Sequence, residues 1–402
     1  MTLWLIVFKS MRQHALSTIV TALSIALAGG LLMSVWVVKE QSQAIFTGVN
    51  GGFDAVLGAR GSKLQLVLNA IFHLEASPGN LSWADYQDIK NNPLVQMAIP
   101  IAVGDNYLGY RLVGTLPELF SDVEYSPGQH YTLTPGGEFF DPGRREAVVG
   151  SFVAQKLGLK RGDKFHPYHG LIFNEKDQHS ETYVVVGVLK PSNTPADRVI
   201  WIPLAGIQKM SGHDPKAATD VSAVLVKLKG GVATGFRLDL MYNKQGNRLT
   251  FAWPIGQVMA DLFSKIGWFD RVLELVAYLV ALVATASILA SIYNSMNERR
   301  REIAILRALG ARRRTIFGVI LLEAAAISAL GMLIAFAFYL AMMTGAAEVI
   351  RAQTGVVLDP VKFNPVMLWA PAALIALGAL AGIVPAFKAY RTDVAEHLAP
   401  TS

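Results

Sequence analysis

Four long apolar stretches constrain this chain more than any other feature of its sequence. Residues 16–38, 275–296 and 367–387 contain no charged side chain, and residues 316–344 contain only Glu323. The hydrocarbon core of a bilayer is about 30 Å thick, and a helix that rises about 1.5 Å per residue crosses it in about 20 residues. Each stretch is long enough, so the sequence predicts an integral membrane α-helical protein with four transmembrane helices.

The composition supports a membrane protein and excludes several other classes. Hydrophobic residues make up 52% of the 402 residues, and charged residues make up only 16%, which is far from an average soluble domain. Because the chain has no cysteine, it has no disulfide, thiolate metal site or cysteine nucleophile. The formal charge is +6, but the basic residues gather beside the apolar stretches. We therefore predict no nucleic-acid partner.

The distribution of Lys and Arg predicts the orientation of the four spans. Lys9 and Arg12 precede the first span, seven arginines lie within residues 299–314, and Lys388 and Arg391 follow the fourth span. The connections on the opposite side carry fewer basic residues. The positive-inside rule then places both termini and the arginine-rich loop in the cytoplasm and residues 40–270 outside. The apolar residues 1–8 predict a lead-in helix at the cytoplasmic face.

Residues 40–270 have an ordinary soluble composition and predict a large α+β domain between the first and second transmembrane helices. Short β-rich runs, such as residues 183–189, 199–202 and 221–228, alternate with helical stretches, such as residues 82–91. We therefore expect three regions. Residues 1–39 form the lead-in and first transmembrane helix, residues 40–270 form the outer domain, and residues 271–402 contain transmembrane helices two to four.

The loop between the second and third spans is more patterned than an orientation signal requires. If residues 298–309 are helical, Ile303, Leu306 and Leu309 fall on one side, while arginines cover much of the rest. Gly310 is expected to end this helix. Such a helix is apolar enough to dock on a protein at the cytoplasmic face. A basic anchor without a partner also explains the arginines, but not the ordered Ile and Leu positions.

The segment NERRREIAILRALGARRRTIFGVILLEAAAISALG, residues 297–331, resembles the signature of the FtsX/MacB-type (LolC/LolE-like) ABC transporter permease family. That signature, E-R-x-x-E-I-[AG]-[IL]-[LM]-[KR]-A-[LI]-G-A, precedes an apolar helix with an early Glu. The matching residues are Arg299, Glu302, Ile303, Leu306, Arg307, Ala308, Leu309, Gly310 and Glu323. The closing segment GIVPAFKAYRTDVAEHL also resembles this family, and residues 146–165 look like part of a MacB-like periplasmic core domain.

The resemblance implies a multi-pass permease of the bacterial inner membrane, with residues 40–270 in the periplasm and residues 298–309 as a cytoplasmic coupling helix. The residues implied to couple to a separate ATP-binding subunit are Arg299, Glu302, Ile303, Leu306, Arg307, Leu309 and Gly310. A second permease chain, identical or different, would complete the transporter, and a periplasmic partner protein and membrane lipid are further possible partners.

ATP and Mg are expected on the partner subunit, because this sequence contains no G-x-x-x-x-G-K-[ST] motif. Residues 58–63 come nearest to that motif and do not match it. We expect no catalytic residue and no cofactor on this chain, and we do not predict it to be an enzyme.

The resemblance implies mechanotransmission, in which ATP hydrolysis moves the periplasmic domain to export or extract a lipidated or amphipathic substrate. Two alternatives remain open. One is a regulatory transmembrane module that activates a periplasmic hydrolase or senses a peptide, and the other is metal-linked transport.

Glu323 is a candidate functional residue, because a carboxylate within a membrane span is energetically costly. Its position near the start of the third span also fits a structural role. There the helix dipole favours a negative charge, and an Arg or Lys at the cytoplasmic face is an available partner.

Four of the eight histidines fall within residues 166–213, namely His166, His169, His179 and His213, and His166 and His169 are the candidates for metal ligands. They lie three residues apart, with Glu175, Asp177 and Glu181 nearby, which fits a zinc site of imidazole and carboxylate ligands. Solvated side chains in a polar loop explain the same pattern, so we do not predict that the chain binds a metal.

Two further patterns each have two interpretations. Small residues recur four positions apart in the spans, as at Gly331 and Ala335 or at Gly378 and Gly382. This spacing allows close helix packing in lipid, although small residues are also common in transmembrane helices. In the outer domain, an apolar helical face runs from Leu64 to Phe72. It packs into the core, or it receives a lipid chain or a partner.

Overall fold

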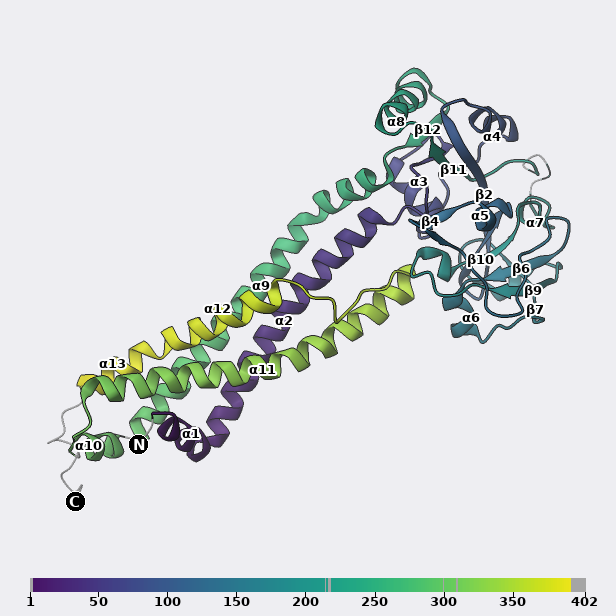
Figure 1. Ribbon diagram of the computed structural model, residues 1–402. Helices are drawn as coiled ribbons and strands as arrows, with labels where there is room; N and C mark the ends of the chain where they lie inside the picture. Colours follow the sequence, from purple (N-terminus) through teal and green to yellow (C-terminus); the bar gives the residue numbers. More distant parts are fainter. Residues whose placement is uncertain (1–2, 214, 216–217, 299, 309, 392–402) are drawn as a thin grey trace. The chain divides into compact units, whose positions relative to one another are not determined.

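The computed structural model describes residues 3–213, 215, 218–298, 300–308 and 310–391. The chain divides into two compact units, which are described separately here (Figure 1). Met1–Gln41, Gly267–Ala347 and Asp359–Ser402 form the first, called the membrane unit, and Ser42–Ile266 and Glu348–Leu358 form the second, called the outer lobe.

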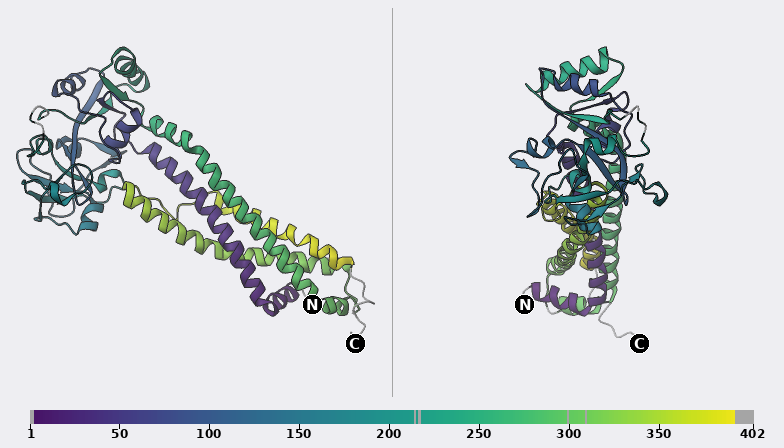
Figure 2. Two further views of the ribbon diagram at one scale, coloured as in Figure 1. Left: turned by 180° about the vertical axis from the view of Figure 1, so that it is seen from behind. Right: turned by 90° about the vertical axis from the view of Figure 1, so that its right-hand side faces the viewer.

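Of the described residues, four helical segments are long and apolar enough to cross a membrane. They are α2 (Ala15–Gly48), α9 (Ile255–Glu298), α11 (Arg313–Thr354) and the pair α12 (Val366–Ala381) and α13 (Ile383–Arg391). Each contains one of the predicted apolar stretches, which confirms the prediction of four spans. Helix α1 (Leu3–Gln13) precedes α2, as the apolar start of the sequence predicts. Within the membrane unit, the spans lie side by side (Figures 1 and 2).

Glycine residues bring these spans into close contact. A Cβ atom added at Gly30 of α2 would lie 2.8 Å from the Cβ of Phe338, and one at Gly331 of α11 would lie 2.7 Å from the Cβ of Ile25. A Cβ at Gly382, just after α12, would lie 2.9 Å from the Cβ of Ala324. These separations are shorter than packed carbon atoms adopt. The small residues therefore allow the helices to pack closely, which is the first of the two interpretations of their spacing.

Polar contacts join α2 to other parts of the membrane unit near the end of its apolar stretch. The Gln41 side chain donates a hydrogen bond to the backbone oxygen of Asp359 and accepts one from its backbone nitrogen, both at 2.9 Å. The Nζ atom of Lys39 lies 2.6 Å from a carboxylate oxygen of Glu274 on α9. These contacts link α2 with α9 and with the connection between α11 and α12.

In the described part of the outer lobe, ten strands form one mixed sheet in the order β12-β1-β11-β2-β3-β10-β6-β9-β7, with β8 paired to β2. The strands are β1 (Ala55–Ala59), β2 (Val95–Tyr107), β3 (Tyr110–Thr115), β6 (Glu146–Val149), β7 (Lys164–Phe165), β8 (Tyr168–His169), β9 (Tyr183–Val188), β10 (Ile200–Pro203), β11 (Ala223–Leu228) and β12 (Leu249–Ala252). β3 and β10 pair in parallel, as do β6 and β9, and the other pairs are antiparallel. A separate hairpin contains β4 (Glu124–Ser126) and β5 (Gln129–His130).

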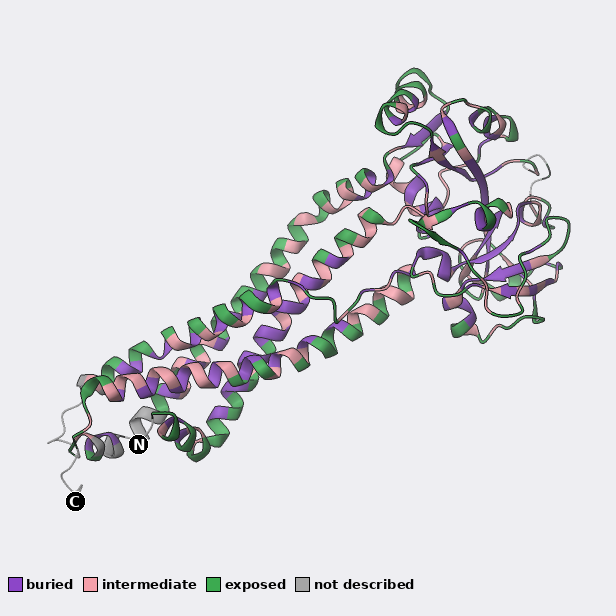
Figure 3. Cartoon of the chain, in the orientation of Figure 1, coloured by how far each residue is buried: buried purple, intermediate pink, exposed green. Residues whose placement is uncertain are grey.

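Successive side chains of the strands enter two different apolar cores, because a strand points alternate residues to opposite faces. On β10, Ile200 and Ile202 pack into one core and Trp201 packs into the other. The described α-helices of the outer lobe are α3 (Lys63–Ala70), α4 (Trp83–Lys90), α5 (Glu118–Ser121), α6 (Ser151–Leu157), α7 (Leu204–Gln208) and α8 (Val232–Asp239). They are accompanied by the 3-10 helices η1 (Glu175–Asp177) and η2 (Pro195–Arg198) and the π-helix η4 (Leu240–Gln245). Figure 3 shows that most strand residues of the sheet are buried. The predicted α+β class of this region is confirmed.

The apolar run from Leu64 to Phe72 is part of this core. Val67, Ile71 and Phe72 are 0%, 6% and 2% exposed, and they pack in the same cluster as Trp201. This burial favours the packing interpretation of the run over a surface that receives a lipid chain.

Candidate functional site

The predicted coupling segment forms a short helix between two spans. Helix α9 continues to Glu298, and the separate helix α10 (Arg300–Ala308) follows it. Gly310 has a φ of +96°, and its N–H donates a 3.0 Å hydrogen bond to the carbonyl of Arg307. Glycine adopts this left-handed conformation without steric cost, so Gly310 ends the helix as the sequence predicts.

The apolar residues of α10 have two different environments. Ile303 is 7% exposed and Ala304 is 1% exposed, and Ile303 belongs to the same apolar core as Ile316 and Ile320 of α11. Ile303 therefore packs α10 against its own chain. The sequence predicted for Ile303 only a contact with an ATP-binding subunit. Ile305, by contrast, is 43% exposed. An apolar side chain on the outside of a basic helix is a suitable contact for a partner protein.

The other predicted coupling residues are described only in part. Arg299 and Leu309 lie outside the described residues, and for Glu302 and Leu306 the backbone alone is described. Arg307 is half-buried. The assignment of these residues to a coupling surface stays a prediction.

Glu323 is buried in the membrane unit and contacts the lead-in helix. Its side chain is 6% exposed, and it accepts a hydrogen bond from the hydroxyl of Ser10 on α1. Burial of a carboxylate requires polar partners. This contact is consistent with the structural interpretation of Glu323, since it links α1 to the beginning of α11.

The C-terminal end of α11 belongs to the outer lobe and contacts α6 there. Lys156 of α6 lies 3.0 Å from the carboxylate of Glu348, and the guanidinium of Arg351 lies 5.5 Å from the ring centre of Phe152. Gly355, directly after α11, has a φ of +77°, and a Cβ there would lie 3.1 Å from the Cα of Pro195. The last turn of α11 is therefore packed against α6 and η2.

The loop beside this contact is held by the carboxylate of Asp197. This carboxylate accepts hydrogen bonds from the backbone nitrogens of Ser192 and Asn193, at 3.0 and 2.8 Å. Burial raises the pKa of Asp197, although these hydrogen bonds favour the charged form. The bonds fix the turn that receives Gly355.

The two candidate metal-ligating histidines, His166 and His169, have different partners in the structure. His166 contacts the backbone oxygen of Glu181 through Nδ1, at 3.1 Å. His169 instead lies beside Asp105, His179 and His213, whose ligand atoms and its own all lie within 4.8 Å of one another. Contact with the Asp105 carboxylate raises the pKa of His213, against the opposing effect of burial. Local spacing misses this group, because the pairing of β2 with β8 brings Asp105 to His169, and the loops after η1 and α7 add His179 and His213.

Two family models match the chain. The MacB-like periplasmic core domain matches residues 15–235, more than half of the chain, and the FtsX-like permease C-terminal domain matches residues 274–394. The second match includes α10 and Glu323.

Similar proteins are known from several bacteria. The chain is 23% identical to the lipoprotein-releasing system transmembrane protein LolC of Haemophilus influenzae, over 85% of this chain and 87% of that protein. It is 29% identical to the pyoverdine export ATP-binding/permease protein PvdT of Pseudomonas syringae, over 75% of this chain and 45% of that protein. The periplasmic region of MacB from Actinobacillus actinomycetemcomitans aligns at 11% identity with a TM-score of 0.34, over 54% of this chain and 94% of that one. The chain thus spans most of the LolC relative and about half of the ATP-binding/permease relative.

Proposed function

Since this chain belongs to the family of ABC transporter permeases of the MacB/LolC type, we propose that it converts ATP hydrolysis by a separate subunit into movement of its outer lobe. The movement would export or extract a lipidated or amphipathic substrate. ATP and Mg would bind to the partner subunit, and a second permease chain would complete the transporter.

The observation that carries this proposal is the continuity of three helices. Helices α2, α9 and α11 each begin in one unit and end in the other without an intervening loop. A continuous helix keeps its hydrogen bonds along its length, so it transmits a displacement better than a flexible linker. The packing of the end of α11 against α6 and η2 also supports transmission of movement, because a helix must be attached to the lobe that it moves.

Helix α10 is the segment through which the ATP-binding subunit would act. It lies between α9 and α11, two of the helices that enter the outer lobe. The arginines around it support a cytoplasmic location for α10 and for both termini, with the outer lobe in the periplasm. A push on α10 would reach α9 and α11 directly, and its anchoring by Ile303 would limit independent movement.

The choice of substrate class rests on the relatives. LolC is named as part of a lipoprotein-releasing system, and the alignment covers most of both chains. PvdT is named for pyoverdine export, and its alignment covers less than half of its length. The former comparison supports a lipidated substrate, and membrane lipid and a periplasmic protein would be further partners.

The proposal is tested by measuring how this permease stimulates the ATPase activity of its copurified ATP-binding subunit in lipid nanodiscs. We expect Leu306→Asp to abolish stimulation while membrane insertion stays normal, because a charge replaces an apolar side chain on the predicted docking face. Ile172→Asp is a matched control, since Ile172 is 84% exposed in the outer lobe. Full ATPase stimulation by the Leu306→Asp protein would contradict the proposal that α10 is the coupling helix.

Copurification from native membranes tests the wider assignment. Recovery of an ATP-binding subunit together with bound lipoprotein or lipid supports transport. Recovery of a periplasmic hydrolase that the permease activates, with no displaced substrate, would instead assign the regulatory function.

A further inference from the structure

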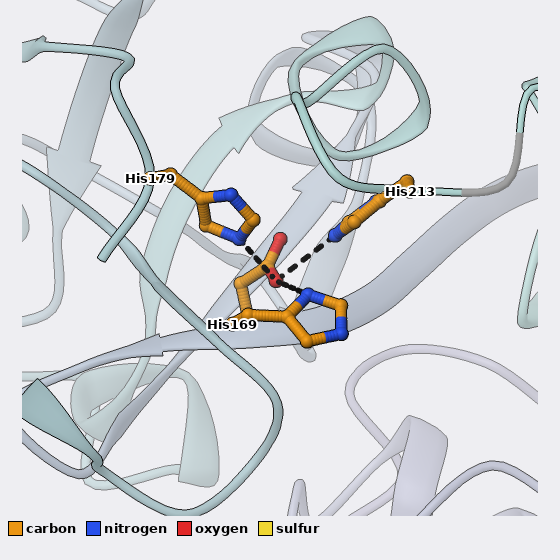
Figure 4. A group of neighbouring side chains, drawn as sticks. His169, His179 and His213 are labelled. Atoms are coloured by element: carbon orange, nitrogen blue, oxygen red, sulfur yellow. Dashed lines mark hydrogen bonds and ion pairs between the residues drawn. The ribbon is translucent and has the colours of Figure 1, made fainter. Parts of the chain in front are cut away.

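We propose that Asp105, His169, His179 and His213 form a binding site for a divalent transition-metal ion in the outer lobe, with Zn²⁺ as the best match. Three imidazole rings converge on one carboxylate oxygen (Figure 4). His179 Nε2 and His213 Nε2 each lie 3.1 Å from Asp105 Oδ1, and His169 Nδ1 lies 3.4 Å from it.

The fold brings these four residues together from separate segments. Asp105 lies on β2 where the register with β3 shifts, and it is directly opposite His169 on β8. His179 follows η1, and His213 lies in the loop after α7. A shift in register re-aims the side chains of a strand, and such irregularities are frequent beside functional sites. Four chain segments therefore direct potential ligands to one point.

The hydrogen positions of His213 indicate that a positive species belongs at this point. Its Nδ1 lies 2.9 Å from the carbonyl oxygen of Ile207, which only accepts hydrogen bonds. Nδ1 therefore carries a hydrogen, and in the neutral ring Nε2 presents a lone pair to the Asp105 carboxylate 3.1 Å away. Two lone pairs at that distance repel each other, so either a proton or a metal ion lies between the two atoms. A metal ion there would turn both atoms into ligands.

The Ile207 contact also has the form that metal-binding histidines commonly show. A ligating imidazole usually donates its second N–H to a carbonyl or carboxylate, which fixes the ring and its tautomer. His213 is only 17% exposed at its side chain, so its ring is held in place as well as oriented.

The two oxygens of Asp105 are used very unequally. Oδ1 has three imidazole neighbours, although a carboxylate oxygen offers about two lone pairs. Oδ2 is buried and has no hydrogen-bond partner among the described residues. A fully buried carboxylate with one crowded and one unpaired oxygen is poorly satisfied by hydrogen bonds alone. An ion shared by the carboxylate and the three rings accounts for both features.

The ligand set and its spacing favour zinc. Zinc binds imidazole nitrogen and carboxylate oxygen at about 2.0–2.2 Å, so neighbouring ligand atoms of a tetrahedral site lie about 3.3 Å apart. The three distances to Asp105 Oδ1 match this spacing. The ligand atoms all lie within 4.8 Å of one another, and any imidazole nitrogens farther apart than this spacing move closer on binding. His169 has room to do so, because its side chain is 55% exposed.

Binding would connect β2, β8 and the loops that follow η1 and α7. An ion that binds only the folded lobe stabilises it by an amount that rises with the logarithm of the ion concentration above the Kd. The site would thus make the stability of the outer lobe depend on zinc, independently of whether ATP-driven movement occurs.

The test uses the untagged full-length protein in detergent, stripped with a chelator and then titrated with Zn²⁺. We expect one bound Zn²⁺ per chain by elemental analysis and calorimetry, and a higher melting temperature in its presence. Co²⁺ in place of Zn²⁺ should give the intense visible absorption of a tetrahedral site.

Single substitutions identify the ligands. His169→Ala should weaken Zn²⁺ binding by at least about ten-fold and leave the fold intact, because this side chain is the most exposed of the four. His166→Ala, a histidine three residues away that is outside the group, should bind Zn²⁺ as the unchanged protein does. Equal affinity in His169→Ala and His166→Ala would overturn the proposal, as would the failure of the unchanged protein to bind Zn²⁺ or an octahedral Co²⁺ spectrum.

Discussion

Replacement of Gly331 by alanine tests whether close helix contact holds the membrane unit together. A Cβ at this position would lie 2.7 Å from the Cβ of Ile25 and 2.8 Å from the backbone oxygen of Ala22. Carbon atoms pack best at about 3.5–4.0 Å, so the contact is too short by roughly 1 Å. The backbone oxygen cannot rotate away, and α2 and α11 must therefore separate.

The expected cost of this separation is about 1–3 kcal/mol, which is typical of overpacking in a well-packed interior. Gly345→Ala is the matched control, because Gly345 lies on the same helix and a Cβ there meets no atom within 4 Å. Both substitutions gain the same helix propensity, up to about 1 kcal/mol. The difference between their unfolding free energies therefore measures the cost of the contact between α2 and α11. The Gly331→Ala protein should be less stable than the Gly345→Ala protein by about 1–3 kcal/mol.

The assay is reversible unfolding in mixed micelles, with the denaturing detergent titrated and helicity recorded. Equal unfolding free energies for the two variants would refute the reasoning, because the contact between α2 and α11 would then have no energetic consequence.

Three further predictions concern other contacts. Burial would raise the pKa of Asp85, but hydrogen bonds from Ser82 and Arg248 lower it below its usual value. Its charge therefore stabilises the fold above about pH 4, and this stabilisation is lost as the pH falls through the folded-state pKa. Asp85→Asn should be less stable than the unchanged protein at pH 7, with a difference that shrinks towards pH 3; a difference that stays constant over this range would contradict it. Ser10→Ala removes a hydrogen bond to Glu323 and should speed amide exchange in α1 but not in α12, and equal speeding in both helices would count against a local anchor. Gly355→Ala forces a residue with a side chain to adopt a φ of +77° beside Pro195, at a cost of about 1–3 kcal/mol, and should speed amide exchange in residues 348–358; unchanged exchange there would show that the turn tolerates a Cβ.

The transmembrane part of the fold was readable from the sequence because its signals are local. An uncharged stretch of sufficient length spans a membrane whatever its neighbours are, and Gly310 ends α10 by its own backbone freedom. The helix start at Ser82 was equally local, since Ser82 and Asp85 form a capping box with each other.

Long-range contacts were beyond the reach of local patterns. The sequence placed Ile303 on an apolar face but could not tell whether this face meets a partner or the chain's own α11. The same limit applies to Asp105, which is 108 residues from His213 and pairs with it only after β2 and α7 are in position. The return of residues 348–358 to the outer lobe likewise depends on packing against α6.

The claim that the outer lobe moves relative to the membrane unit is tested most directly by a distance measurement between the two units. The chain has no cysteine, so Ile172→Cys and Val361→Cys provide unique sites for spin labels, at side chains that are 84% and 80% exposed. In nanodiscs with the ATP-binding subunit, electron paramagnetic resonance should show a different distance distribution with trapped ATP than without nucleotide. Identical distributions in the two states would contradict mechanotransmission by this permease.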